Sequence, residues 1–370
     1  MIEQKRLGDI ATYINGFAFK PEDRGTVGLP IIRIQDLTGN AYDLGFYAGN
    51  YPERIEINDG DVLISWSASL GVYVWDKGKA LLNQHIFKVV FDKCEVNREY
   101  FVYAVRYKLK EMESKTHGAT MKHIVKKDFD NTLIPFPTLE EQKNIANLLD
   151  KISTIILVRQ QQLQKLDELV KARFVEMFGD CKSMVSMNKL CSIITDGTHQ
   201  PPRFQESGIP FIFVSNLVGN VVTYNAEKFI SEDTYAELYK RTPIEIGDLL
   251  LSTVGSYGHP AVVTEDRKFL FQRHIAYLKP RHNMVNSFYL HSALLAPDGQ
   301  RQIEEKVKGI AQKTLNLSEI KKIVVPLPTI EEQNQFEKFV NQTDKSKVAV
   351  QKSLDEAQLL FDSLMQHYFG

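Results

Sequence analysis

The residue patterns that could carry nucleotide or methyl-transfer chemistry are absent from this sequence. It has no Gly-x-x-x-x-Gly-Lys-Ser/Thr phosphate loop and no Gly-x-Gly-x-x-Gly turn. An amino-methyltransferase would need Asn or Asp, two prolines and an aromatic residue in succession. The nearest string, Gln-Pro-Pro-Arg at 200–203, has the wrong first and last residues. The sequence therefore indicates no such chemistry in this chain.

The cysteines and two repeated histidines are the next candidates for chemistry. Cys94, Cys181 and Cys191 form no Cys-x-x-Cys pair and have no His at a zinc-ligand spacing, so we interpret them as reduced and structural. His85 and His274 recur at matching places, but each one enters an apolar run, which favours a structural histidine over a general base. We expect no catalytic residue and no metal site.

Composition is that of an ordinary soluble protein. The 370 residues are 43% hydrophobic and 25% charged, and the formal net charge of -1 gives no bulk argument for a polyanionic partner. No run of 18 apolar residues occurs, and the first residues lack the layout of a signal peptide. We expect a cytoplasmic protein with no membrane partner, in which any basic surface is local.

The sequence is one module written twice. Pairs of similar segments, one from each copy, follow in the same order along the chain, and the number of residues between the members of a pair changes only through small insertions. They are GLPIIRIQDLTGN (28–40) with GIPFIFVSNLVGN (208–220), GDVLIS (60–65) with GDLLLS (247–252), QHI (84–86) with RHI (273–275), and PFPTLEEQ (135–142) with PLPTIEEQ (326–333). We call the last pair the first and second entry segments.

Each module combines a globular part with a long helix. Short β-type runs bounded by Gly, Asn and Pro, followed by one helical run, predict an α+β globular part. In the entry segments, Thr138 with Glu141 and Thr329 with Glu332 form capping-box patterns, which predict helix starts. The predicted domains are two globular parts, 1–137 and 179–328, and two long helices, 138–178 and 329–370.

The two long helices carry matching apolar seams. Steps of four and three residues give an a/d pattern typical of a coiled coil, although two ordinary amphipathic core helices are an alternative. Polar exceptions complement one another, since Arg159 corresponds to Val350 and Lys347 to Ile156, so we expect the helices to pair with each other. The apolar seam residues are Ile145, Leu149, Ile152, Ile156, Leu163, Leu166, Val170, Phe336, Val340, Val350, Leu354, Phe361 and Leu364.

The attachment points of the second globular part favour antiparallel pairing. A domain of this size is about 40 Å across, whereas parallel pairing would require it to bridge about 60 Å of helix. The predicted fold class is therefore α+β, with two tandem, pseudo-twofold-related globular domains joined by a long antiparallel two-helix coiled coil.

The doubled entry segments, in register with Gly-Asp-x-Leu-x-Ser and with QHI/RHI, resemble the specificity (S) subunit of a type I restriction–modification system. The resemblance covers the whole chain. It implies that each globular part is a target-recognition domain reading one half of a bipartite site in double-stranded DNA. It also implies that the helices are a spacer and a docking surface for two methyltransferase (M) subunits. S-adenosylmethionine, ATP and Mg would be bound by the M and restriction/translocase (R) subunits, and this chain would hold no cofactor.

The resemblance suggests how to sort the polar residues of the two copies. Phosphate contacts carry no sequence information, so positions shared by the copies are phosphate candidates, while unshared positions are base candidates. A solvated surface residue is at least as good an interpretation of each position, and the better one for every candidate except Lys122 and Lys313. The shared candidates are Ser65, Lys122, Ser252 and Lys313, and the unshared ones are Lys20, Arg24, Gln35, His199, Gln200, Arg203 and Asn216.

Two other functions fit the same sequence features. A specificity subunit of a related system, in which the methylase is fused to the nuclease, would share all of them. A coiled-coil adaptor that binds proteins or glycans would fit the near-neutral charge. DNA binding with steep salt dependence would distinguish either kind of specificity subunit from the adaptor.

Overall fold

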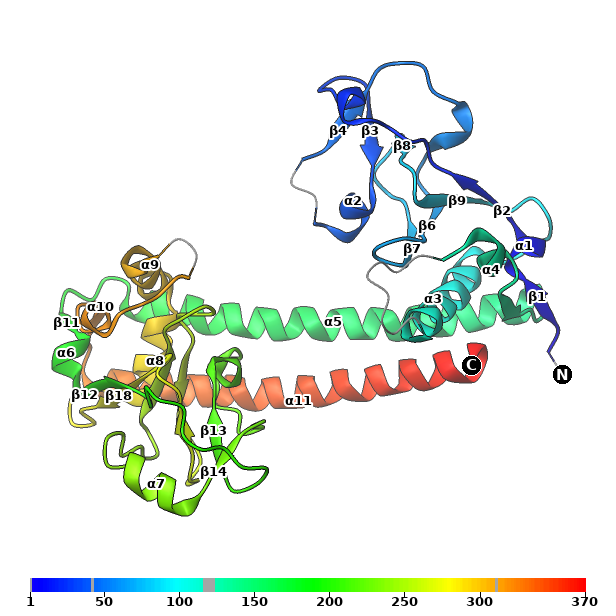
Figure 1. The fold of residues 1–370 in the computed structure, drawn as a ribbon. Coiled ribbons are helices and arrows are strands. Elements are labelled where there is room, and N and C mark those ends of the chain that lie inside the picture. Colours follow the sequence, from blue (N-terminus) through cyan, green and yellow to red (C-terminus); the bar gives the residue numbers. More distant parts are fainter. Residues whose placement is uncertain (1, 41–42, 116–123, 310–311) are drawn as a thin grey trace. The chain divides into compact units, whose positions relative to one another are not determined.

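The chain folds into two compact units in the computed structural model, which describes residues 2–40, 43–115, 124–309 and 312–370. The first unit comprises Met1–Arg159 and Ser353–Gly370, and the second comprises Gln160–Lys352. Each unit holds one globular part with segments of both long helices, α5 (Leu139–Phe178) and α11 (Ile330–Phe369) (Figure 1). The compact units therefore differ from the four consecutive segments predicted, because each takes part of both helices.

Three sheets build the globular part of the first unit. The antiparallel sheet has the order β2-β9-β6-β7, the mixed sheet has the order β4-β3-β8-β5 with β3 and β8 parallel, and β1 pairs with β10. The strands are β1 (Gln4–Arg6), β2 (Thr12–Asn15), β3 (Leu29–Ile32), β4 (Gly45–Tyr47), β5 (Glu56–Ile57), β6 (Val62–Ser65), β7 (Gly71–Val74), β8 (Ala80–Leu82), β9 (Ile86–Val90) and β10 (Leu133–Pro135).

The second unit repeats this architecture. Its sheets have the orders β12-β18-β15-β16 and β14-β13-β17, and β11 pairs with β19 as β1 pairs with β10. The strands are β11 (Met184–Ser186), β12 (Cys191–Asp196), β13 (Ile209–Ile212), β14 (Phe229–Ile230), β15 (Leu249–Ser252), β16 (Pro260–Val262), β17 (Leu270–Phe271), β18 (Ile275–Pro280) and β19 (Val324–Pro326).

One helix of the first copy is divided in the second. α3 (Arg98–Lys115) is continuous, whereas the corresponding stretch forms α8 (Ser287–Leu295) and α9 (Pro297–Lys306). Pro297 has no backbone N–H to donate and disfavours the helical conformation at Ala296, whose ψ is 155°. The short helices are α1 (Leu7–Ile10), α2 (Ile34–Thr38), α4 (Lys126–Asp130), α6 (Met187–Leu190), α7 (Glu232–Leu238) and α10 (Leu317–Ile320).

Each unit has a main core that includes side chains from both long helices. In the first unit, α3 packs Tyr100 and Phe101 in a cluster that contains Leu149 of α5 and Phe369 of α11. In the second, Tyr289 of α8 lies 5.4 Å from the ring of Phe174, 5.0 Å from that of Phe178 and 6.3 Å from that of Phe336. Burying large aromatic rings in this way removes much apolar area from water, so it fixes the helix segments to the globular part.

The long helices run antiparallel within the second unit. Asp167 and Phe174 of α5 contact Lys347 and Phe336 of α11, respectively, so residue numbers rise along one helix as they fall along the other. In the first unit, Arg159 Nε donates a hydrogen bond to Ser353 Oγ at 3.2 Å. The predicted apolar seam residues, listed above, are all buried or partly buried.

The entry segments fix the start of each long helix in the same way. Thr138 and Glu141 form the predicted capping box, with Thr138 N donating to Glu141 Oε2 at 3.0 Å and Glu141 N donating to Thr138 Oγ1 at 3.3 Å. Thr329 and Glu332 repeat it at 2.9 and 3.3 Å. These bonds satisfy backbone donors that the first helical turn leaves without partners.

A buried glutamine follows each capping box and joins the long helix to the globular part. Gln142 accepts from Asn97 N at 2.9 Å and donates to Pro137 O at 2.9 Å. Gln333 accepts from Asn286 N at 2.8 Å and donates to Pro328 O at 3.0 Å. Both glutamines are at most 1% exposed, so these bonds are shielded from water and the amide cannot be removed without leaving buried partners unpaired.

Candidate nucleic-acid interface

Four loops of the second unit meet along one edge of its globular part. Arg273 N donates to Thr198 O at 3.1 Å, and Thr253 N donates to His274 O at 2.9 Å. Leu315 N donates to Thr253 O at 2.8 Å. These backbone bonds hold 197–203, 253–256, 272–274 and 312–315 together, and we call these residues the second loop edge.

The first unit has the equivalent backbone bonds. Gln84 N donates to Phe17 O at 2.9 Å, and Trp66 N donates to His85 O at 3.2 Å. Ile124 N donates to Trp66 O at 3.0 Å. Residues 16–20, 66–69, 83–85 and 124 therefore form the first loop edge, position for position the counterpart of the second.

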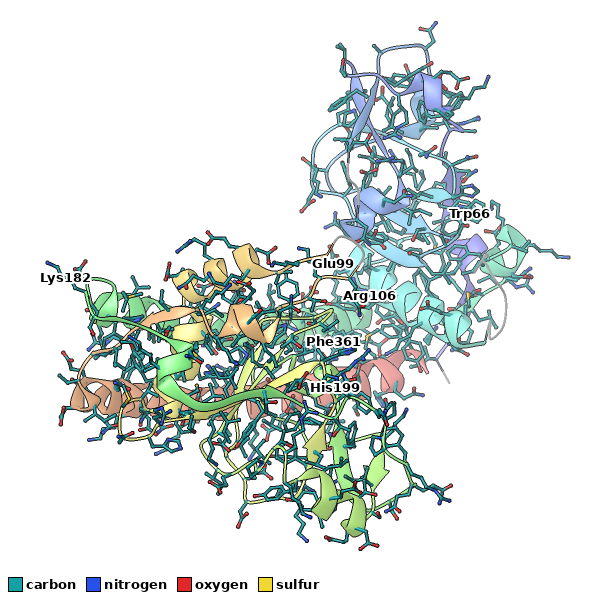
Figure 2. The ribbon with its side chains drawn as sticks, turned by 60° about the vertical axis from the view of Figure 1, so that its left-hand side comes forward. Trp66, Glu99, Arg106, Lys182, His199 and Phe361 are labelled. Atoms are coloured by element: carbon teal, nitrogen blue, oxygen red, sulfur yellow. The ribbon has the colours of Figure 1, made fainter. Side chains whose placement is uncertain are left out.

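The side chains that the two loop edges carry are different. Trp66 of the first edge lies against His85, with ring centroids 4.9 Å apart, and stacks on Phe87 at 5.5 Å; Thr253 takes its place in the second. Figure 2 labels Trp66 in the first unit and His199 in the second. Phe17, 38% exposed, stands where the second edge has Thr198. The first edge is thus aromatic where the second is polar.

Asp196 organises the charged groups beside the second loop edge. Its carboxylate lies 2.8 Å from His199 Nε2 and 2.6 Å from Arg241 Nη2. Gln200 and Arg203 follow along the same loop, and both are exposed with no hydrogen-bond or ion-pair partner among the described residues. The three candidates of this loop, His199, Gln200 and Arg203, therefore lie close together. Of the three, His199 already has a carboxylate partner.

The basic phosphate candidates have different outcomes. Lys313 lies on the second loop edge, with Nζ 3.1 Å from Glu304 Oε1 and 3.3 Å from the Tyr257 hydroxyl. The Glu304 carboxylate, with a smaller contribution from Tyr257, raises the pKa of Lys313. Its cation is partly neutralised before any ligand arrives. Lys122, its counterpart, lies outside the described residues.

The two serine candidates are wrong. Ser65 and Ser252 are both 0% exposed. The Ser65 hydroxyl donates to Ser69 O at 2.5 Å, and the Ser252 hydroxyl accepts from His259 N at 2.9 Å. Both hydroxyls close the turn that follows a buried strand, so neither can reach a phosphate group.

Asn216 is also wrong as a base candidate. It is 8% exposed, and its side-chain oxygen accepts from Phe213 N at 3.0 Å. Its amide donates to Thr223 O at 3.0 Å and to Asn225 O at 3.2 Å. A buried amide with these bonds holds the chain after β13 in place and has no group left for a base edge.

The remaining candidates of the first unit lie near or beyond its loop edge. Lys20 is exposed at the edge, and the ion-pair partner that it has among the described residues, Glu22, is 4.0 Å away. Arg24 is half-buried and pairs with Asp43 at 3.1 Å, so its guanidinium has a partner within the protein. Gln35 is exposed on α2, outside the residues that define the edge.

Sequence reasoning missed two kinds of polar residue. Gln142 and Gln333 are the buried links described above, and their repetition in the entry segments was the available signal. Gln84 and Arg273 lie at equivalent points of the loop edges, and their place as the first residues of the repeated QHI/RHI pattern was the available signal. His85 has a φ of 70°, and its Nδ1 is buried with no partner among the described residues.

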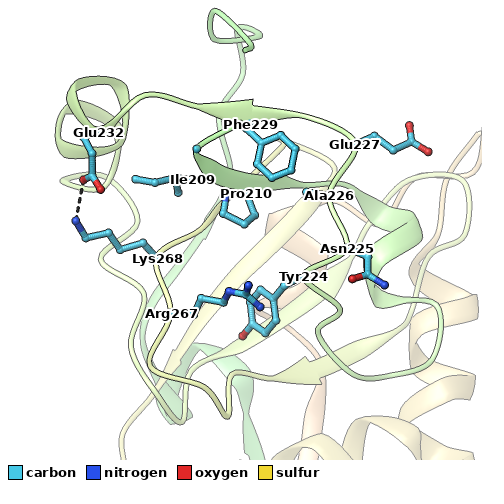
Figure 3. A pocket seen from close by; sticks show the side chains of 11 residues that line it. Ile209, Pro210, Tyr224, Asn225, Ala226, Glu227, Phe229, Glu232, Arg267 and Lys268 are labelled. Atoms are coloured by element: carbon cyan, nitrogen blue, oxygen red, sulfur yellow. Dashed lines mark hydrogen bonds and ion pairs between the residues drawn. The ribbon is translucent and has the colours of Figure 1, made fainter. Parts of the chain in front are cut away.

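A separate hollow of the second unit is lined by none of the loop-edge residues (Figure 3). The Arg267 guanidinium lies 5.0 Å from the ring centre of Tyr224, and Lys268 pairs with Glu232 at 2.7 Å (Figure 3). Since its two cations already have partners, we do not assign the hollow to nucleic acid.

The described part of the chain contains no group of three or more His, Cys, Asp or Glu side chains placed to hold a metal ion. None of its helices is long and apolar enough to cross a membrane.

Comparison with known proteins identifies the class of the chain. The family profile described as "Type I restriction modification DNA specificity domain" matches residues 2–168 and 203–357. The chain therefore belongs to the type I restriction–modification specificity subunits, and the resemblance drawn from the repeated motifs is confirmed. The two matched stretches correspond to the two copies of the module.

Individual relatives span both copies. The type I restriction enzyme EcoBI specificity subunit of Escherichia coli is 28% identical over 97% of this chain and 83% of its own length. The MjaVIII specificity subunit of Methanocaldococcus jannaschii is 21% identical over 76% of this chain and 71% of its own length.

Solved structures of low identity share the fold. The S subunit of a type I system from M. genitalium superposes with a TM-score of 0.56 and 15% identity, covering 100% of this chain and 96% of that one. A chain from a structure of type I restriction–modification complex assembly gives a TM-score of 0.60 and 18% identity, covering 99% and 97%.

Proposed function

We propose that this chain reads a bipartite sequence in double-stranded DNA, with one loop edge for each half. The observation that carries the proposal is that the two edges share their backbone hydrogen bonds and differ in their side chains. A common frame suits the common shape of the duplex, while different side chains suit two different base sequences.

The chain is proposed to recognise DNA without modifying it. Family membership and the absence of nucleotide-binding and methyl-transfer motifs in the sequence support this division of labour. Two methyltransferase subunits would bind S-adenosylmethionine and methylate adenine, and restriction subunits would use ATP and Mg. Because chromosomal DNA is the substrate of such a complex, we place it in the cytoplasm.

The long helices are proposed as the docking surface for the methyltransferase subunits. In the first unit, the faces of α5 and α11 away from the seam expose Ile155, Leu359 and Leu360 at 45%, 73% and 52%. In the second unit, Leu169 and Val348 are 48% and 71% exposed. Apolar side chains this exposed on helices whose seam is already paired favour contact with another protein.

A domain exchange tests the proposed DNA recognition. The chain, co-purified with the methyltransferase subunit of its own system, is assayed for DNA binding across a salt titration and for the motif that it methylates. We expect binding to weaken steeply with salt. Replacing 1–137 by the matching domain of a relative is expected to change one half of the motif and leave the other intact.

Two results would contradict the proposal. Binding that is absent or independent of salt would favour the adaptor function. A folded exchange variant that changes both halves of the motif would show that the two units do not recognise DNA separately.

A further inference from the structure

The inference drawn here rests on the proposed function and concerns one position in each loop edge. Gln84 and Arg273 occupy the same place in the two copies. Both follow a strand that pairs in parallel with its neighbour, β8 with β3 and β17 with β13. The backbone N–H of each bonds to the first variable loop, at Phe17 O or Thr198 O. The carbonyl of the next residue accepts from the second variable loop, at Trp66 N or Thr253 N. Each residue is therefore fixed between two variable loops.

The side chains at this position are exposed and available. Neither the Gln84 amide nor the two terminal nitrogens of Arg273 has a hydrogen-bond or ion-pair partner among the described residues. Arg273 Nε donates to His274 Nε2 at 3.3 Å. Burial, and the charge of Arg273 itself, lower the pKa of His274, so its ring is neutral and can accept this bond. One side of the guanidinium is thus held by the protein, which leaves the terminal pair of N–H groups for a ligand.

Glutamine and arginine are complementary to different bases. A glutamine amide can donate to N7 and accept from N6 of adenine, and an arginine guanidinium can donate twice to O6 and N7 of guanine, both in the major groove. We propose that this equivalent position is a specificity-determining residue of each unit, at which Gln84 reads an adenine in one half-site and Arg273 reads a guanine in the other.

Gln200 and Arg203 are also exposed and without a partner among the described residues, but none of the backbone bonds that join the loops of the second edge runs through either of them. The remaining polar side chains near the edges fit this role less well. His199 and Arg241 share the Asp196 carboxylate, and Lys313 is paired with Glu304. Lys20 has one ammonium group on a flexible stem, which suits a phosphate better than the paired atoms of a base edge. Gln84 and Arg273 combine a fixed backbone with a planar, two-pronged group that has no competing carboxylate in the described part of the chain.

Reciprocal substitution tests the proposal. Arg273→Gln and Gln84→Arg are made separately in the full chain and co-purified with the methyltransferase subunit of the same system. Binding is selected from a randomised DNA library, and the methylated motif is sequenced. Arg273→Gln is expected to reduce the preference for guanine at one position of one half-site by about 5- to 150-fold, the range expected for one two-pronged base contact. Gln84→Arg is expected to change one position of the other half-site.

Arg267→Gln is the matched control. It removes the same side chain from the same unit at the hollow of Figure 3, and it is expected to leave the motif unchanged. Thermal unfolding of each variant checks that the exposed substitution leaves the fold intact.

The outcomes separate this inference from the proposed function. Uniform weakening for all sequences, with a shallower salt dependence, would mean that Arg273 binds phosphate and would overturn the inference while DNA recognition stands. An unchanged motif in both variants would also overturn it. If the unaltered complex selects no sequence from the library, the proposed function itself fails.

Discussion

At the entry segments the two units use the same side chains for the same hydrogen bonds, whereas at the loop edges they use the same backbone groups and different side chains. Gln142 and Gln333 bond to equivalent partners. At the loop edges, by contrast, Trp66 of the first unit is replaced by Thr253 in the second, and Gln84 is replaced by Arg273. Both units must attach the start of a long helix to a globular part, and both do so with the same side-chain hydrogen bonds. The contrast shows which residues serve the frame and which are open to selection for a target.

The largest expected effect comes from placing a charge in the shared frame. Ile152 is 5% exposed in the seam, so Ile152→Asp would bury a carboxylate without a partner. We expect the free energy of unfolding to fall by about 3–5 kcal/mol, measured by urea denaturation. Leu148→Asp, on the same helix at a position 39% exposed, is the control and should cost far less. Equal losses would show that the seam does not face the partner helix.

Removing the buried glutamines tests whether the two entry segments are equivalent. Gln142→Ala and Gln333→Ala each leave a backbone N–H and a carbonyl unpaired, at an expected cost of about 1–3 kcal/mol in the free energy of unfolding. Gln333 also donates to Met284 O at 3.2 Å, so its loss should be the larger of the two. Gln164→Ala, which removes an exposed bond to Glu168, is the control in a thermal denaturation series. A large effect in one unit alone would break the equivalence.

A smaller effect is expected at the capping boxes. Thr138→Ala and Thr329→Ala each remove the hydroxyl that accepts a bond from the first helical turn. We expect each to lower the free energy of unfolding by about 1 kcal/mol, with Thr→Ser largely retaining it. If Thr→Ser is as costly as Thr→Ala, the methyl group rather than the hydroxyl carries the effect.

The smallest expected effect is the pH dependence of the first capping box. Hydrogen bonds from the Thr138 side chain and backbone lower the pKa of Glu141 below its ordinary 4.5. Because the folded pKa is the lower one, the carboxylate contributes stability above about pH 4.5 and loses it as the pH falls through the folded pKa. The stability difference between the unaltered protein and Glu141→Gln should therefore shrink below this pH. A constant difference from pH 6 to pH 3, with Glu140→Gln as the charge control, would contradict the assignment.

The helices were predictable because their signals are local. Thr138 with Glu141 sets the start of one helix, and the apolar spacing from Ile145 to Val170 and from Phe336 to Leu364 sets the buried face of each. Pro297 could have divided the helix of the second copy, but its consequence depends on whether tertiary contacts override it. The boundaries of the compact units were not predictable, because they follow from which segments of α5 and α11 pack on each globular part.

The candidate site was less predictable, because the polarity of a side chain does not show whether it is exposed to a ligand or bonded within the protein. Ser65 and Ser252 are shared polar residues, yet both faces of their strands are buried and the hydroxyls bond internally. Asn216 and Gln35 carry the same amide group but have different surroundings. The amide of Asn216 is hydrogen-bonded to the chain around and after β13, whereas Gln35 is exposed. Gln84 and Arg273 could not be predicted as exposed recognition residues, because in the sequence each one just precedes an apolar strand. Their place on the loop edges follows only from the loops that converge on them in the fold.

The backbone bonds of the loop edges bear on how such a protein acquires new targets. Each of the bonds that ties Phe17, Trp66 and Gln84 together runs between main-chain groups, which every residue except proline supplies. A mutation at Phe17 or Gln84, both of which are exposed, alters what the edge presents while leaving the bonds intact, and exposed substitutions of this kind usually change stability by less than about 0.5 kcal/mol. The edge can therefore drift through many side-chain combinations at little risk of misfolding. Evolvability is in this sense a property of the hydrogen-bonding pattern itself.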